Sequence, residues 1–312
     1  MLDSYGRSIE YLRLSVTERC QQRCTYCSKS SDKCLKESEL SADKLVLIAK
    51  ACSQLGCSKI RLTGGEPLLR RDICEIIERI SDLQSYHDIA ITTNGQMLPL
   101  YAKELKKSGL MRCNISLDSL KADKYKEITG GNLQSVLRGI EAARSCSLSP
   151  IKLNVVLIKG KNDDEIDDFI DLAKKNPFEI RFIELMPMGD SGQNGINNSE
   201  ILKQRKWLKP VECEDSSQPA CVFSAVGFKG RIGFISPMSH SFCGSCNRIR
   251  VTSDGFLRPC LGSNLEYSLK EALESGEEAL RERIRHAVKN KPKSNSFGSS
   301  FETNRKMNRI GG

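Results

Sequence analysis

The chain has 312 residues, of which 39% are hydrophobic and 28% charged, a composition typical of a globular protein with one large domain or two smaller ones. No apolar run is long enough to span a bilayer and the N-terminus has no apolar signal core, so we expect a cytoplasmic protein with no membrane partner. The net charge of +9 fits either a basic surface or a pocket for a polyanion, but the basic residues are spread along the chain and only 6% of residues are aromatic, which argues against nucleic acid.

The first 190 residues alternate between short β-rich runs and helical patterns. The β-rich runs lie at 11–16, 59–63, 88–92, 112–117, 151–157 and 179–184. Apolar residues at helical spacing predict helices at 41–56 and 72–83, and a third helix is expected to begin at Asn162, with Glu165 completing a capping box. Repeated βα units predict a parallel sheet, and six units are fewer than a closed barrel needs, so we expect an α/β fold with an incomplete (β/α)6 TIM-like barrel whose active residues lie at the C-terminal ends of its strands.

The pattern changes after Met188. Residues 189–199 are rich in Gly, Asn and Ser and are typical of a linker, 220–256 contain β-like stretches, and 265–290 are helical and charged. We therefore divide the chain into a partial barrel at 1–190, a smaller C-terminal module at 191–290 that carries a second cluster and binds substrate, and a flexible tail at 291–312 that ends in Gly-Gly.

Six of the fourteen cysteines form two tight groups, and the first group directly follows the first predicted strand. Cys20, Cys24 and Cys27 have the spacing C-x3-C-x2-C, which suits three ligands of a [4Fe-4S] cluster whose fourth iron stays open for a small molecule. The alternative is a structural zinc site with a fourth ligand from elsewhere, but the chain has only three histidines to offer.

The second group is Cys243, Cys246 and Cys260, with the spacing C-x2-C-x13-C and again no obvious fourth ligand. A zinc ribbon that lacks one cysteine and a purely structural cluster are the alternatives here. Arg248 and Arg250 follow at alternate positions, so on a strand both would point to the same side and could bind a phosphate or the edge of a base. Their ordinary alternative is a solvated strand face.

The first cysteine group, with its aromatic residue before the last cysteine, resembles the radical S-adenosylmethionine (SAM) superfamily. The segment Thr63-Gly64-Gly65-Glu66-Pro67 resembles the GGE segment of the same superfamily. With the stretches IRLTGGEPLLRRD, NISLDSL and SFCGSCNRIRVTSDGFLRPCL and the terminal Gly-Gly, nearly the whole chain resembles the GTP 3′,8-cyclase family of molybdenum cofactor biosynthesis. The resemblance implies two [4Fe-4S] clusters and SAM as cofactors, and GTP as substrate.

The resemblance also implies roles for individual residues. The clusters would be held by the two cysteine groups, and SAM would contact Tyr26, Gly65, Ser116 and Met186. GTP would contact Arg13, Arg61, Thr92, Lys152, Arg248, Ile249 and Arg250. The catalytic candidates are Arg13, Gly311 and Gly312, although without the resemblance the two glycines would be an ordinary chain end.

In the implied lyase reaction a 5′-deoxyadenosyl radical takes the hydrogen from C3′ of GTP, and C3′ then attacks C8 of guanine to give 3′,8-cyclo-7,8-dihydro-GTP. The implied partners are an electron donor such as ferredoxin or flavodoxin and the downstream cyclic pyranopterin monophosphate synthase. Two alternatives are a peptide- or haem-modifying maturase with two clusters and a non-catalytic electron carrier or zinc-binding regulator. The maturase usually has more cysteines in its C-terminal module, and the carrier would need neither the glycine pair nor the barrel.

Overall fold

The computed structural model describes residues 1–27, 39–188, 194–212, 217–297, 301 and 303–311. Its strands are β1 (Tyr11–Ser15), β2 (Lys59–Thr63), β3 (Asp88–Thr93), β4 (Arg112–Ser116), β5 (Lys152–Leu157), β6 (Glu179–Glu184), β7 (Lys209–Pro210), β8 (Ala220–Ser224), β9 (Arg231–Ile235), β10 (Arg248–Val251), β11 (Phe256–Arg258) and β12 (Tyr267–Ser268). Its α-helices are α1 (Ala42–Gln54), α2 (Ile73–Ser81), α3 (Leu98–Lys107), α4 (Ala122–Thr129), α5 (Leu133–Ser145), α6 (Ile166–Lys175), α7 (Asn198–Gln204), α8 (Lys270–Ser275), α9 (Glu277–Lys289) and α10 (Met307–Ile310). Short 3-10 helices are η2 (Pro67–Leu69), η3 (Asp163–Glu165) and η4 (Cys243–Ser245).

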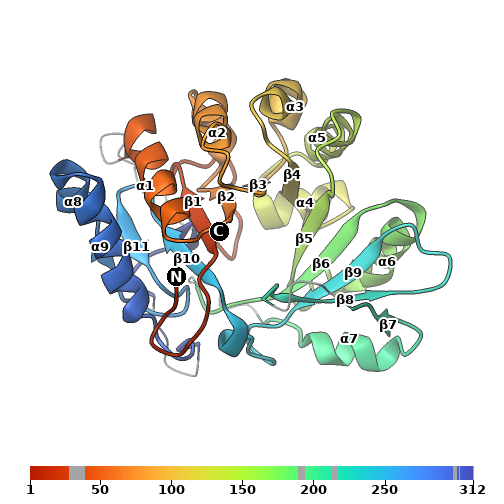
Figure 1. Cartoon of the computed structure of the whole chain (residues 1–312). Helices are drawn as coiled ribbons and strands as arrows, with labels where there is room; N and C mark the ends of the chain where they lie inside the picture. The colour runs from red at the N-terminus through yellow and green to blue at the C-terminus, as the bar shows by residue number, and fades with distance from the viewer. Residues whose placement is uncertain (28–38, 189–193, 213–216, 298–300, 302, 312) are drawn as a thin grey trace.

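The described strands form one open sheet in the order β12-β11-β10-β1-β2-β3-β4-β5-β6-β9-β8-β7. All six strands predicted from the sequence are present, and they pair in chain order as parallel neighbours. In Figure 1 the helices α1, α2, α3 and α5 follow one another along the outer side of this curved sheet. The incomplete α/β barrel predicted from the sequence is therefore confirmed.

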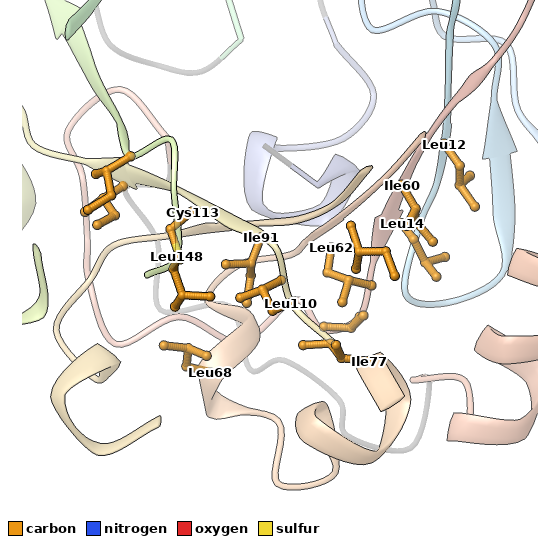
Figure 2. Packing of buried hydrophobic residues seen from close by; sticks show 14 of the residues in the cluster. Leu12, Leu14, Ile60, Leu62, Leu68, Ile77, Ile91, Leu110, Cys113 and Leu148 are labelled. Carbon is orange, nitrogen blue, oxygen red and sulfur yellow. The ribbon is translucent and has the colours of Figure 1, made fainter. Parts of the chain in front are cut away.

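Alternate residues of each strand point to opposite sides of the sheet, and the outer side is apolar. Leu12, Leu14, Ile60, Leu62 and Ile91 are fully buried there, and Figure 2 shows them packed with apolar residues of the surrounding helices and loops. The other set of alternate residues faces the inside of the barrel and is mostly polar, as the next subsection describes. Burial of the outer set contributes most of the stability of such a barrel.

The C-terminal part of the chain adds strands to both edges of the six-stranded sheet. On one edge β10 pairs in parallel with β1, and on the other β9 pairs in parallel with β6. Figure 1 shows blue β10 and β11 beside red β1, and the cyan β9 and β8 beside green β6. The sequence indicated β-like stretches at 220–256 but not that they lie at opposite edges, so the proposed boundary at residue 190 separates segments of one continuous sheet.

One local prediction is wrong. No side-chain capping bond forms at the start of η3 or α6, so Asn162 and Glu165 do not make a capping box. Asn162 instead donates to the carbonyls of Asp118 (2.7 Å) and Val156 (2.9 Å), and Glu165 accepts from Ser119 and Leu120. Both side chains are fully buried, and contacts between distant segments outweigh the local capping pattern.

The tail also differs from the expectation of a flexible end. Among its described residues Lys291, Phe297 and Ile310 are buried, and Ile310 and Phe297 pack with Met188 beside β6. Arg305 of the tail pairs with Asp254 at 2.9 Å. The described part of the tail is thus packed against the barrel. The expected linker overlaps residues 189–193, which lie outside the described residues, while Asn197 already caps α7.

The described residues include no helix that is long and apolar enough to span a membrane.

Replacing Gly139 with alanine should destabilise the fold, whereas an unhindered helical Gly→Ala change stabilises by about 1 kcal/mol. A Cβ atom at Gly139 in α5 would lie 2.1 Å from the carbonyl oxygen of Gly95, just before α3, so the two helices would have to separate. We expect a loss of about 1–3 kcal/mol in the free energy of unfolding, measured by urea titration without oxygen. Gln134→Ala, at an exposed position of the same helix, is the control and should stay within about 0.5 kcal/mol. Equal or higher stability of Gly139→Ala would contradict this close approach.

Candidate active site

The first cysteine group lies on the segment Cys20–Cys27, which we call the cluster loop, beyond the C-terminal end of β1. The end of α4 holds its backbone: the amides of Arg23 and Thr25 donate to the carbonyls of Thr129 and Ile128, both at 2.9 Å. Main-chain hydrogen bonds to α4, the helix that follows β4, therefore hold the loop in place.

Gly64 and Gly65 follow β2 and lie against the segment that leads into the cluster loop. The amide of Gly65 donates to the carbonyl of Thr17 at 2.8 Å, and a Cβ atom at Gly65 would lie 2.3 Å from the carbonyl oxygen of Arg19. No side chain fits there. The sequence interpretation attributed the glycine pair to the approach of a ligand, but the structure shows that the pair first accommodates the neighbouring loop.

Glu66 completes the GGE segment and was not among the candidate residues. It is fully buried and accepts hydrogen bonds from the Thr93 hydroxyl and the Asn94 amide, both at 2.7 Å. Burial raises the pKa of Glu66 to about 7. This carboxylate joins the loop after β2 to the loop after β3, and its position in the GGE motif was the signal that could have found it.

The thiols of the first group fit a site that needs a metal cation. Burial, together with the neighbouring Cys20 and Asp118, raises the pKa of Cys27 to about 12; burial and the same carboxylate raise the pKa of Cys24. Thiols bind metal as thiolates, so a bound cation would supply the missing positive charge. Across the described parts of the chain no three His, Cys, Asp or Glu side chains could hold one ion together, and a [4Fe-4S] cluster does not require this because each cysteine binds a different iron.

The second cysteine group has the opposite electrostatics. Although burial opposes it, the charges of Arg248 and Lys291 lower the pKa of Cys246 to about 7. The Lys291 ammonium is itself fixed, because it donates to the carbonyls of Arg248 (2.8 Å) and Pro259 (2.5 Å). The backbone amide and the side-chain amide of Asn295 both donate to the Cys243 sulfur at 3.3 Å. These contacts favour a thiolate at Cys246, whereas burial raises the pKa of Cys260.

The two groups lie at opposite ends of the barrel interior. The cluster loop follows the C-terminal end of β1, whereas Cys243 and Cys246 precede β10, which runs parallel to β1. Cys260 follows β11, which is antiparallel to β10, so it lies at the same end as Cys246. The expectation that active residues gather at the C-terminal strand ends therefore holds for the first group but not for the second.

Inward-facing cations lie between the two groups. Arg13 of β1 is in register with Arg61 of β2 on one side and with Arg250 of β10 on the other. Among the described residues neither Arg13 nor Arg61 has a carboxylate partner; Arg61 lies over the ring of Tyr11, 5.3 Å from its centroid. This row of buried guanidinium groups is the centre of the candidate site.

Two further arginines face the interior, and both are neutralised. Arg112 binds Asp88 through two nitrogens, and Arg181 pairs with Glu179 at 2.5 Å. Lys152 also reaches Glu179, at 3.3 Å. The sequence analysis did not include Arg112 and Arg181, although their alternation with apolar residues on predicted strands was a usable signal.

Several buried polar atoms of the inner face have no hydrogen-bond partner. They are Tyr11 Oη, Arg13 Nε, Arg61 Nε, Thr63 Oγ1, Thr92 Oγ1, Asn114 Nδ2, Asn154 Oδ1 and Arg248 Nη2. Buried polar groups in folded proteins almost always have partners, so such a concentration on one face indicates a ligand. Burial, together with repulsion between neighbouring cations, lowers the pKa of Arg13, Arg61 and Arg250. Guanidinium groups stay protonated, so the lowered pKa values reflect the electrostatic cost of burying these cations together. A bound anion would reduce that cost.

The described end of the tail enters this interior. Arg250 donates to the carbonyl of Gly311 at 2.7 Å. Gly311 has a φ of +84°, and a Cβ atom there would lie 2.6 Å from Thr63 Oγ1 and 2.8 Å from Ser15 Cβ. Only glycine fits this position. The other catalytic candidate of the tail, Gly312, lies outside the described residues.

The residues expected to contact SAM are found near the cluster loop. Ser116 is the last residue of β4, and Met186 follows β6 and packs against Met188 and Ile310. Tyr26 lies on the loop itself. Ile249, expected to contact GTP, has its side chain in the hydrophobic core on the outer side of the sheet, so only its backbone could face a ligand.

Comparisons with known proteins agree with this geometry. The model of the radical SAM superfamily matches residues 14–173, and that of the C-terminal domain of molybdenum cofactor synthesis matches residues 178–297. The chain is 48% identical to the GTP 3′,8-cyclase of Alkaliphilus oremlandii over the whole of both chains, and 47% identical to that of Clostridium botulinum over 89% of each. In fold it is similar to Streptococcus suis SuiB with its precursor peptide SuiA, at a TM-score of 0.64 and 14% identity, over 97% of this chain and 76% of that one.

The interior should bind a polyanion less tightly as the pH rises through about 8. Burial, together with the nearby Arg181 and Arg112, lowers the pKa of Lys152 to about 8, so its positive charge is present below that pH and is lost above it. We expect the dissociation constant of inorganic triphosphate, measured by titration calorimetry, to rise between pH 7 and pH 9. The rise in the wild type should be roughly tenfold larger than the rise in Lys152→Arg. Arginine keeps its charge, so the comparison at each pH removes the ionisation of the ligand itself. Parallel pH profiles for the two proteins would show that Lys152 does not face the anion.

Proposed function

The chain belongs to the radical SAM superfamily, and we propose that it is a GTP 3′,8-cyclase, which converts GTP to 3′,8-cyclo-7,8-dihydro-GTP in the first step of molybdenum cofactor biosynthesis. Relatives of that name are 45–48% identical over most of the chain. The observation that carries the proposal is the barrel interior between the two cysteine groups, where Arg13 and Arg61 have no carboxylate partner among the described residues and buried polar atoms such as their Nε atoms have no hydrogen-bond partner there.

A [4Fe-4S] cluster and SAM follow from membership of the superfamily. Cys20, Cys24 and Cys27 would hold the cluster, and with SAM it supplies, when bound, the radical that removes a hydrogen atom from the substrate. We assign a second [4Fe-4S] cluster to Cys243, Cys246 and Cys260, because Arg248 and Lys291 already favour the thiolate at Cys246. This second site lies at the far end of the interior, where it would hold the substrate.

The chain's own residues bind and orient GTP. Arg13, Arg61 and Arg250 would hold the triphosphate, since several positioned cations in a dry pocket bind phosphate far more strongly than the same cations in water. Arg248 lies over the Phe242 ring, 4.8 Å from its centroid, beside the second cysteine group, and would face the guanine. Thr92 and Lys152 share the register row of Asn114 and would contact the nucleotide between these two ends.

The tail would exclude water from the reacting atoms. Ile310 is 1% exposed and Gly311 lies between Ser15 and Thr63, so the described tail occupies space that solvent would otherwise fill. A radical reaction needs such exclusion because solvent and side reactions would quench the intermediate. Gly311 and Gly312 would therefore shield the substrate rather than carry charge.

The reaction also requires partners. We propose a one-electron donor such as ferredoxin or flavodoxin, and cyclic pyranopterin monophosphate synthase as the enzyme that takes the product. A cytoplasmic location suits the free thiols of the twelve described cysteines, which a reducing compartment preserves.

The decisive experiment mixes the anaerobically reconstituted protein with GTP, SAM and dithionite. We expect about eight irons per chain, as two four-iron clusters require, and formation of 5′-deoxyadenosine that depends on GTP. Chromatography and mass spectrometry of the nucleotide product complete the measurement. GTP-independent cleavage without a cyclised product would favour a maturase, and zinc in place of iron would exclude any radical enzyme.

Gly311→Ala should abolish most product formation, because the added Cβ atom would collide with Ser15 and Thr63 and push the tail out of the interior. We expect at least a hundredfold loss of GTP-dependent 5′-deoxyadenosine formation, since even small misplacements at a reacting centre have effects of this size. Iron content is measured as well, because the backbone of Asn308 in the same tail hydrogen-bonds to Cys27 and a loss of iron would assign the defect to the first cysteine group instead. Full turnover in this variant would mean that the tail is not part of the closed site.

A further inference from the structure

We infer that Asp118 is a positioning residue of the radical site, which fixes the cluster loop through the hydroxyl of Tyr26. The inference rests on the proposed function, because it concerns how the chain holds the cluster and SAM. It concerns a residue to which the resemblance gives no role.

Asp118 lies just beyond β4 and connects three segments that are far apart in the sequence. Its side chain is 1% exposed. Its Oδ2 accepts a hydrogen bond from the Tyr26 hydroxyl at 2.7 Å, and its Oδ1 accepts one from the Val156 amide at 2.9 Å. Both carboxylate oxygens are therefore used, one by the cluster loop and one by the main chain of β5.

The carboxylate is held rigidly on the side of the barrel. Val156 is inside β5, so its amide cannot move without the sheet, and the carbonyl of Asp118 accepts from Asn162 Nδ2 at 2.7 Å. Asn162 in turn accepts from the Ile158 amide at 2.9 Å. The contacts that replaced the predicted capping box thus hold Asp118 in place, and the carboxylate transmits the position of β4 and β5 to the cluster loop.

Tyr26 lies on the cluster loop between Cys24 and Cys27, so its orientation affects both sulfurs. Several other contacts of the loop go to α4: Gln22 donates to the Tyr125 hydroxyl at 2.8 Å, next to the backbone bonds from Arg23 and Thr25. The bond to Asp118 holds a side chain that directly precedes Cys27 and lies two residues after Cys24. Losing it would leave a buried hydroxyl and a buried carboxylate oxygen without partners.

The competing explanation is that Asp118 only stabilises the turn between β4 and α4. Glu165 provides a matched comparison, because it is also a buried carboxylate that accepts bonds from this turn, from Ser119 (2.8 Å) and the Leu120 amide (2.7 Å). Its hydrogen bonds go to the turn and not to the cluster loop. A residue that only supports the turn would behave like Glu165.

The test compares Tyr26→Phe, Asp118→Asn, the double variant and Glu165→Gln in full-length, anaerobically reconstituted protein. The readouts are iron content, the electron paramagnetic resonance spectrum of the reduced cluster, and the dissociation constant of SAM from the change that it causes in that spectrum. Tyr26→Phe removes only the hydroxyl, so it tests the bond with the least risk to folding.

We expect Tyr26→Phe and Asp118→Asn each to alter the cluster spectrum and to weaken SAM binding about tenfold, as the loss of one buried hydrogen bond to a charged group predicts. The double variant should bind SAM no more weakly than the single variant with the lower affinity, because both substitutions remove the same hydrogen bond. Glu165→Gln should keep the wild-type spectrum and affinity.

Wild-type spectra and affinities in both single variants would overturn the inference, as would additive losses in the double variant or an equal loss in Glu165→Gln. Failure of the proposed function would look different. In that case the wild type itself would bind SAM but form no 5′-deoxyadenosine in a GTP-dependent way, whatever the variants do.

Discussion

The buried row of arginines inside the barrel is the constraint on which the rest of the structure depends. Arg13, Arg61 and Arg250 lie side by side across three strands, and repulsion between neighbouring cations adds to the cost of their burial. A protein can retain such a row only if the outer side of the same strands is strongly stabilising and if the row is needed for binding. The continuous apolar packing of Leu12, Leu14 and their neighbours supplies the first condition, and a polyanionic substrate would supply the second.

The way the C-terminal segment joins the sheet explains why this row lies between the two cysteine groups. Because β10 pairs with β1, Arg250 becomes a direct neighbour of Arg13, and the second cysteine group is brought to the N-terminal end of the parallel strands. The first group stays at the opposite end. A substrate that reaches both cysteine groups would thus lie along the strands and cross this row.

The sequence predicted the elements whose signal is local. The six strands are correct because alternating or continuous apolar runs are bounded by turns, and the two cysteine groups are recognisable because their spacing is short. The placement of β9 and β10 at opposite edges, the packing of the tail and the role of Asp118 depend on contacts across tens to hundreds of residues. The capping box at Asn162 failed for the same reason, since a buried side chain satisfied distant carbonyls rather than its own helix. Within the site, the substrate-binding roles of Arg13 and Arg61 could be predicted only from the resemblance to the family. An isolated arginine on a strand has the same local sequence pattern whether it faces a substrate or solvent.

The two cysteine groups differ in the charges that surround their thiols, so the two ends of the interior differ in how readily they hold negative charge. At Cys246 two fixed cations lower the pKa to about 7, whereas burial raises the pKa of Cys260 at the same end. At Cys24 and Cys27 burial and the Asp118 carboxylate raise the pKa, so this end opposes negative charge. Negative charge near an iron–sulfur cluster disfavours the addition of an electron, whereas nearby cations favour it. The same fold therefore places a site that resists reduction beside the cluster loop, where a strongly reducing cluster is useful for cleaving a cofactor. Beside Arg248 it places Cys246, whose thiolate is favoured by fixed cations.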